Sequence, residues 1–172
     1  IEAYHDREFT TFLVSNGTRP GVLEAVAPTQ LYVSLDAPDR ETYESVVRPR
    51  EDTAWEDLLA SLDALRDHES RTTIRTTLVA GENMADPAGY AAHYERADPD
   101  FIEIKGYMHV GTSRDRLDRD AMPDHEEGAA FARSVQDHLP AYDVFREAPP
   151  SNVAMLAKEP DTMVPELAGP GA

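Results

Sequence analysis

Short apolar runs rich in β-branched and aromatic residues alternate along the chain with longer stretches of helical periodicity. Each short run stops close to Gly, Pro or Asn, which is typical of strands, and these runs cover 9–15, 30–36, 72–79 and 100–105. Helices are predicted after Pro20 and over 40–47, 53–68, 86–97 and 124–139. In the helix over 53–68, the apolar stripe that begins at Trp55 predicts a buried face.

The two ends of the chain depart from this alternation. Residues 141–147 and 152–157 predict two further strands around a Pro-Pro pair, and the Pro-containing segment 159–172 predicts a disordered tail. Residues 2–7 have the pattern of the last turns of a helix, and the first residue is Ile1. We therefore expect the chain to be part of a longer protein.

Strand–helix alternation with this spacing predicts an α/β fold of parallel strands joined by right-handed crossovers. Four strand units are too few to close an eight-stranded barrel, so we expect part of a (βα) barrel over 1–158, ending in a C-terminal hairpin. Ligands bind such sheets at the carboxyl ends of the strands. The polar residues expected at those ends are Asn16, Ser34, Asp36, Asn83, Glu103 and Lys105.

The charge of the chain is strongly negative, with 33 Asp and Glu residues against 16 Lys and Arg residues and a net charge of −17. Only Lys105 and Lys158 are lysines. An acidic, lysine-poor surface is typical of proteins that work in molar salt, where repulsion is screened within about 3 Å. We therefore expect a halophilic source. Because counterion release is weak in such salt, the charge does not exclude an RNA partner.

The residue types that are missing narrow the function further. The sequence contains no cysteine, so this chain alone forms no disulfide and holds no iron–sulfur cluster through thiolates. Because we find no apolar run of membrane-spanning length and no secretory signal pattern, we expect a cytoplasmic protein without a membrane partner.

Two pairs of polar residues alternate along predicted strands and so share a face. Ser34 and Asp36 offer a donor and an acceptor suited to a ribose, an ammonium group or a carboxylate; alternatively, Asp36 caps the following turn. Lys105 follows Glu103 in the same way. Its amine is suited to holding a carboxylate or forming a Schiff base, and the commonest alternative is a structural ion pair with Glu103.

The loop over 106–123 offers two further kinds of chemistry. His109, together with Asp36 and Glu103, is a candidate set of metal ligands, which leaves a metal-dependent lyase or isomerase as an alternative function. Arg114 and Arg116 are suited to phosphate contacts, with arginines 48 and 50 expected nearby, although a solvated and self-paired loop has the same composition.

Several stretches resemble the family of tRNA 4-demethylwyosine synthases, which are radical S-adenosylmethionine enzymes. The longest are Phe-Leu-Val-Ser-Asn-Gly-Thr-Arg-Pro over 12–20, Pro-Thr-Gln-Leu-Tyr-Val-Ser-Leu-Asp-Ala-Pro over 28–38 and Ile-Lys-Gly-Tyr-Met-His-Val-Gly over 104–111. Together with Met-Pro-Asp-His-Glu-Glu over 122–127, they run in the family's order from about residue 9 to residue 140. The chain is thus similar to the C-terminal part of a haloarchaeal member of the family.

The resemblance implies an activity for the parent enzyme. It implies a lyase that condenses N1-methylguanosine in phenylalanine tRNA with pyruvate-derived carbons, using S-adenosylmethionine and a 4Fe–4S cluster. The three cluster cysteines and a Schiff-base lysine are expected upstream of Ile1, in the same gene or in a separate chain. The chain alone is therefore expected to be inactive, and the alternative is a fragment that keeps only ligand or tRNA binding.

The same resemblance assigns roles to residues of this chain. Those expected to bind S-adenosylmethionine are Asn16, Ser34, Asp36 and Asn83. Those expected to line the catalytic mouth are Lys105, Tyr107 and His109. Those expected to contact the tRNA are Arg48, Arg114 and Arg116. No metal ligand is expected within the chain.

Overall fold

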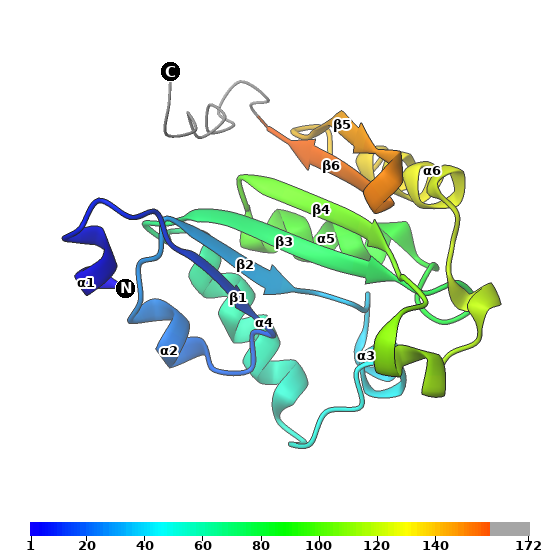
Figure 1. Cartoon of the computed structure of the whole chain (residues 1–172), viewed down its shortest axis with the longest axis horizontal. Helices are drawn as coiled ribbons and strands as arrows, with labels where there is room; N and C mark the ends of the chain where they lie inside the picture. The colour runs from blue at the N-terminus through cyan, green and yellow to red at the C-terminus, as the bar shows by residue number, and fades with distance from the viewer. Residues whose placement is uncertain (159–172) are drawn as a thin grey trace.

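Six strands form one sheet in the order β1-β2-β3-β4-β6-β5 in the computed structural model, which describes residues 1–158 (Figure 1). The strands are β1 (Phe12–Ser15), β2 (Gln30–Ser34), β3 (Arg71–Leu78), β4 (Phe101–Gly106), β5 (Asp143–Ala148) and β6 (Val153–Ala157). The first four are parallel, whereas β6 pairs antiparallel with both β4 and β5. The predicted α/β fold with a C-terminal hairpin is confirmed, and the tail predicted over 159–172 lies outside the described residues.

Six α-helices lie between or before these strands in the described part of the chain. They are α1 (Glu2–His5), α2 (Pro20–Glu24), α3 (Arg40–Val46), α4 (Ala54–Leu65), α5 (Pro87–Ala97) and α6 (His125–Gln136). The loop predicted over 106–123 contains two 3₁₀ turns, η1 (Gly111–Asp115) and η2 (Arg119–Ala121), and a third, η3 (Pro149–Ser151), joins β5 to β6. Within 1–158, no helix combines the length and apolarity that crossing a bilayer requires.

Aspartate side chains begin three of these helices. Asp39 accepts a hydrogen bond from the N–H of Thr42 at the start of α3. Asp124 and Glu127 form a reciprocal capping box at the start of α6. Asp86 caps α5, where Pro87 occupies the first turn. Each carboxylate accepts from an N–H that has no partner inside the helix, and so fixes where the helix starts.

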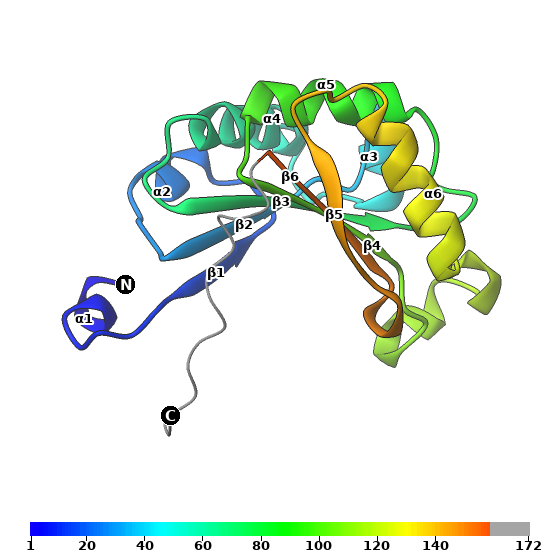
Figure 2. The same ribbon diagram turned by 90° about the horizontal axis from the view of Figure 1, so that it is seen from above.

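The hydrophobic core lies between the sheet and helices α4, α5 and α6, which cover its convex face (Figure 2). The predicted stripe on α4 is buried from Trp55 through Leu58 and Leu62 to Leu65. The core side chains from the strands alternate with residues of the other face: Leu31, Val33, Ile74, Leu78, Ile102, Ile104 and Leu156. This period of two is what a sheet buried on one face requires.

The concave face of the sheet carries the remaining strand residues and is covered by no helix among residues 1–158 (Figure 2). Tyr32, Arg75, Glu103 and Lys105 belong to this set. Polar and charged groups therefore alternate with the core residues of the same strands, so the register that builds the core also places the candidate chemistry on one open surface.

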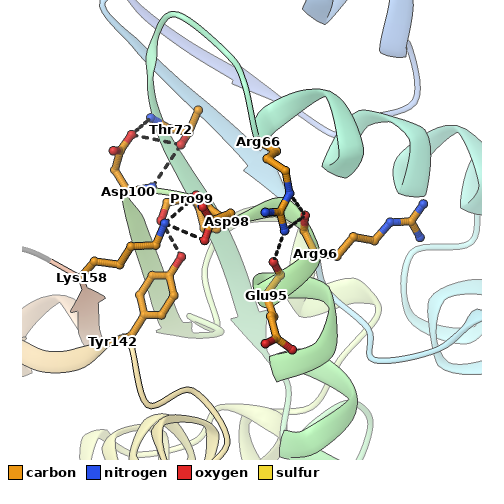
Figure 3. A network of polar contacts seen from close by, with 9 residues as sticks. All are labelled: Arg66, Thr72, Glu95, Arg96, Asp98, Pro99, Asp100, Tyr142 and Lys158. Carbon is orange, nitrogen blue, oxygen red and sulfur yellow. Dashed lines mark hydrogen bonds and ion pairs between the residues drawn. The ribbon is translucent and has the colours of Figure 1, made fainter.

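A polar network anchors the C-terminal hairpin at the amino ends of the parallel strands (Figure 3). Lys158, which follows β6, forms an ion pair with Asp98 at 2.7 Å, and its amine lies 5.4 Å from the centre of the Tyr142 ring. Asp100, before β4, accepts a 2.7 Å hydrogen bond from the N–H of Thr72 on β3. The network occupies one end of the sheet and leaves the carboxyl ends of the parallel strands to the candidate site.

We predict that Gly17→Ala destabilises the fold by about 2 to 4 kcal/mol, because Gly17 has a positive φ of 74° and an added Cβ would lie 2.6 Å from Leu58 Cδ1. Urea denaturation should show the lower midpoint at an unchanged slope. Gly21→Ala is the matched control, since nothing lies within 4 Å of its Cβ position. Equal midpoints for the two variants would contradict the prediction.

Candidate active site

The polar residues of the concave face form rows across neighbouring strands. Ser34 pairs in register with Arg75, and Arg75 pairs with Glu103. In the next row toward the carboxyl ends, Thr77 pairs with Lys105. Because paired residues of a parallel ladder point to the same face, these groups share one surface.

The row formed by Ser34, Arg75 and Glu103 contains a nearly buried ion pair. The Arg75 guanidinium donates from Nε to Oε1 of Glu103 at 2.8 Å and lies 4.7 Å from the centre of the Tyr32 ring. Glu103 is only 8% exposed. Burial and, after it, the Glu103 charge raise the pKa of Tyr32, so its hydroxyl stays protonated. These residues form a rigid wall for the site, since removing either charge would leave the other buried and uncompensated.

The side chain of Lys105 has neither an ion pair nor a hydrogen bond with any residue of 1–158, although the residue is half-buried. The predicted alternative in which Lys105 pairs with Glu103 is therefore wrong, because Arg75 already occupies that carboxylate. The hydroxyl of Ser34 likewise has no hydrogen-bond partner within the described residues. Both side chains are consequently available to a ligand on the concave face.

Two of the predicted ligand-binding residues are instead bonded to the chain's own backbone. Asp36 accepts from the N–H of Thr77 at 2.7 Å, and burial raises the pKa of its carboxyl group. Asn83, 1% exposed, accepts from the Val79 N–H and donates to the carbonyl oxygens of Asp36 and Thr77. Their shared effect is to hold the loop after β2 against the end of β3. The turn-capping alternative for Asp36 is not what the structure shows: Asp39 caps the next helix.

Asn16 lies exposed at the end of β1. Its Oδ1 accepts from the N–H and the hydroxyl of Thr18, and its Nδ2 has no partner among residues 1–158. The residue lines a surface hollow of ≈ 310 Å³ together with Tyr43, Arg48 and Arg50. Asn16 therefore keeps free donors beside an arginine-lined depression.

Tyr107, His109 and Ser113 form a hydrogen-bonded group in the loop after β4. The Tyr107 hydroxyl lies 3.1 Å from His109 Nδ1 and 3.1 Å from Ser113 Oγ, and Ser113 Oγ donates to the carbonyl of Val110 at 2.5 Å. Arg114 donates from Nε to the His109 carbonyl. The structure thus brings together two of the three predicted mouth residues and adds Ser113, which lies in the loop predicted over 106–123.

The metal-ligand alternative is wrong for residues 1–158, where no three His, Asp or Glu side chains are arranged to hold a metal ion. Each predicted ligand is engaged elsewhere. Glu103 binds Arg75, Asp36 binds the Thr77 N–H, and His109 binds Tyr107.

The structure brings Arg48 and Arg116 to one small pocket, which Ser45 and Glu82 also line. Arg48 has a positive φ of 52°, and its Nε donates to the Ser45 carbonyl. Arg114 is not among the residues that line this pocket. Two of the three predicted phosphate-contacting arginines therefore lie together, with the Glu82 carboxylate beside them.

The chain is similar in sequence to proteins that are named for wyosine formation in tRNA. A family model described as wyosine base formation matches residues 96–158. An S-adenosyl-L-methionine-dependent tRNA 4-demethylwyosine synthase of Pyrococcus horikoshii is 46% identical over 164 residues, which cover 92% of this chain and 48% of that protein. The chain thus spans about half the length of the Pyrococcus horikoshii and Methanocaldococcus jannaschii relatives that it matches.

Solved structures agree with the sequence relationship. The structure of TYW1 with a lysine-pyruvate adduct bound matches with a TM-score of 0.84 and 40% identity, over 92% of this chain and 50% of that chain. The radical SAM enzyme coproporphyrinogen III oxidase from Escherichia coli matches with a TM-score of 0.57 and 16% identity, over 88% of this chain and 35% of that chain. The second match concerns the fold alone, which is consistent with part of a (βα) barrel.

Asn83→Ala should destabilise the protein by about 2 to 4 kcal/mol. The reason is that the Val79 N–H and the carbonyl oxygens of Asp36 and Thr77 would lose their buried hydrogen-bond partner. Asn16→Ala is the matched control and should cost at most about 1 kcal/mol, since Asn16 is exposed. Chemical denaturation of both variants measures the difference. A loss of stability at Asn83 no larger than that at Asn16 would contradict the bonding described.

Asp36→Asn should change how stability depends on pH. Because the pKa of Asp36 is raised by burial, the folded chain binds its proton more tightly than the unfolded chain. The contribution of Asp36 to stability therefore falls as pH rises from about 4 toward the raised pKa, and the amide removes this fall. The free energy of unfolding of the variant minus that of the native chain should increase across this window and then stay constant.

Urea denaturation at a series of pH values between about 4 and 7 measures this difference. Asp115→Asn, on the exposed turn η1, controls for the loss of one negative charge. A difference for Asp36→Asn that decreases with rising pH would overturn the assignment.

Proposed function

Because the chain is related in sequence and fold to tRNA 4-demethylwyosine synthases, over about half the length of the Pyrococcus horikoshii protein, we propose that it is the C-terminal part of such an enzyme. It acts in wyosine-base formation on tRNA, in a lyase reaction of the radical S-adenosylmethionine type. The observation that carries this proposal is the 46% identity over 92% of the chain, which includes the strands of the concave face. The substrates we propose are N1-methylguanosine in phenylalanine tRNA and pyruvate.

The residues of this chain do not fit a 4Fe–4S cluster, because the sequence has no cysteine to ligate it. The thiolates must come from another segment, either upstream in the same protein or in a separate chain. We therefore propose that this chain alone is catalytically inactive. It retains binding surfaces for ligand and tRNA, which is also the second candidate function that the lack of cysteine favours.

The donor groups at the carboxyl ends of β1 and β2 fit S-adenosylmethionine, which when bound supplies the radical chemistry that activates the methylguanosine. Ser34 and Asn16 have unpartnered donors at the carboxyl ends of β2 and β1, suited to the carboxylate and ribose hydroxyls of that cofactor. Asp36 and Asn83 act behind them, because their hydrogen bonds fix the backbone from which Ser34 projects. We assign the first two to contact and the last two to positioning.

Three residues line the substrate side of the same face in this proposal. Lys105 offers an uncompensated ammonium group, which is suited to a substrate carboxylate or to negative charge that develops in the reaction. His109 supplies an imidazole at the mouth of the site, and Tyr107 holds that imidazole through its hydroxyl. Each group belongs to β4 or the loop that follows it, so they approach the substrate from one side.

The tRNA backbone lies against Arg48 and Arg116, with Arg114 on the adjoining turn. A net charge of −17 opposes RNA binding at low salt, and molar salt screens this repulsion within about 3 Å. We therefore propose a haloarchaeal type of enzyme that works on tRNA in the cytoplasm.

The test is a reconstitution with S-adenosylmethionine, a reductant, pyruvate and tRNA that carries N1-methylguanosine. The full chain alone should release no 5′-deoxyadenosine. Addition of the cysteine-bearing segment, sought in the DNA immediately upstream, should yield 4-demethylwyosine, detected by mass spectrometry. Turnover by the chain alone, or none after the cluster is assembled on that segment, would overturn the proposal.

Calorimetry tests the cofactor contact directly on the reconstituted protein. Ser34→Ala should weaken S-adenosylmethionine binding by about 10-fold, the effect of losing one hydrogen bond to a charged group. Ser134→Ala, at an exposed position on α6, is the matched control and should leave the affinity unchanged. Equal affinities for the two variants would remove Ser34 from the binding site.

A further inference from the structure

The hydrogen bonds that link His109, Tyr107 and Ser113 end at the Val110 carbonyl oxygen, which can only accept. This carbonyl therefore fixes the direction of each of these hydrogen bonds. Ser113 Oγ lies 2.5 Å from the carbonyl oxygen of Val110, so the Ser113 hydroxyl must donate there. The Ser113 oxygen can then only accept, and it accepts a hydrogen bond from the Tyr107 hydroxyl at 3.1 Å.

The same reasoning determines the tautomer of His109. A tyrosine hydroxyl has a single proton, and the proton of Tyr107 is already used in the hydrogen bond to Ser113. The Tyr107 oxygen can therefore only accept from His109 Nδ1, which lies 3.1 Å away, so the proton of the neutral ring is on Nδ1. Nε2 then carries a lone pair, and it has no hydrogen-bond partner within residues 1–158.

The loop that carries this group is fixed to the sheet. The N–H of Tyr107 donates to the carbonyl of Leu78 at the end of β3, and the Tyr107 side chain is 7% exposed. Arg114 holds the backbone on the other side, through the carbonyl oxygen of His109. The ring of His109 is half-exposed, so its Nε2 is held in one place and remains open to a bound molecule.

We propose that His109 is the proton acceptor of this site and that Ser113 is the residue that positions its proton. The N–H, O–H or acidic C–H bond of a bound substrate breaks, its proton forms a bond to Nε2, and the imidazolium later releases a proton to water. The role as base rests on the function proposed above, whereas the assignment of the tautomer does not. A base held in the opposite tautomer would present a proton where an acceptor is needed.

Nitrogen-15 NMR of the histidine-labelled full chain tests the tautomer at a pH where the measured titration of His109 shows a neutral ring. Nδ1 should be protonated and Nε2 unprotonated. In Ser113→Ala, the Tyr107 hydroxyl loses its acceptor and turns to Nδ1, so the tautomer should reverse. Ser113→Thr keeps a hydroxyl and should restore the native tautomer.

His68 is the internal control in the same spectra. Its Nδ1 accepts from the N–H of Ser70 at 3.0 Å, so its proton lies on Nε2, which donates to the Leu23 carbonyl. This opposite tautomer should persist in every variant that keeps the native fold. A native His109 protonated on Nε2, or a Ser113→Ala chain with intact His68 signals and no reversal, would overturn the proposal.

A second variant and an activity measurement separate the two parts. If Ser113→Ala loses the His68 signals and is unfolded, Tyr107→Phe decides instead. The fixed Nδ1 proton should give way to a mixture of tautomers, and an unchanged tautomer contradicts the proposal.

In the reconstituted enzyme, Ser113→Ala should lower kcat about 100-fold, with unchanged S-adenosylmethionine affinity and recovery in Ser113→Thr. An unchanged kcat excludes the role as base, whereas a native enzyme without turnover is a failure of the proposed function, and the spectra then still decide on the tautomer.

Discussion

Burial of one face of the parallel sheet is the constraint on which the rest of this structure depends. Val33, Ile74 and Ile102 are fully buried against the helices, and the period of two sends their neighbours to the other face. A slip of one residue in β3 or β4 would bury Arg75 or Lys105 and expose core residues of that strand. The free energy that holds the fold together therefore also sets the position of each group on the concave face.

The concave face combines a satisfied ion pair with an unsatisfied cation. Arg75 and Glu103 neutralise each other within the wall, and both are restrained further by contacts with Tyr32. Lys105, two residues beyond Glu103 on the same strand, is left without a counter-charge in a protein whose net charge is −17. An isolated positive group in such a strongly negative chain attracts anions locally, which is the property that a binding face for carboxylates or phosphates needs.

The sequence predicted the helices, the strands and the carboxyl-end location of the polar residues, because periodicity and turn residues are local signals. It did not predict which polar group bonds to which. The pairing of Arg75 with Glu103 joins residues 28 positions apart and depends on the register of two strands. The use of Asn83 as a backbone clamp, and of Ser113 as an acceptor for Tyr107, depends on how loops fold over strand ends. A single sequence contains no periodic signal for such contacts.

The two edge strands of the sheet, β1 and β5, differ in their ability to pair with a further strand. β5 is bulged between Val144 and Arg146 and presents exposed charges, features that resist the addition of another strand. β1 is short but carries Phe12 and Val14, 57% and 50% exposed, beside an unpaired backbone edge within the described residues. The β5 edge therefore resists pairing with another strand, whereas the β1 edge can accept one. Any strand added from elsewhere would extend the sheet beside Asn16 and leave the Lys105 side of the concave face open.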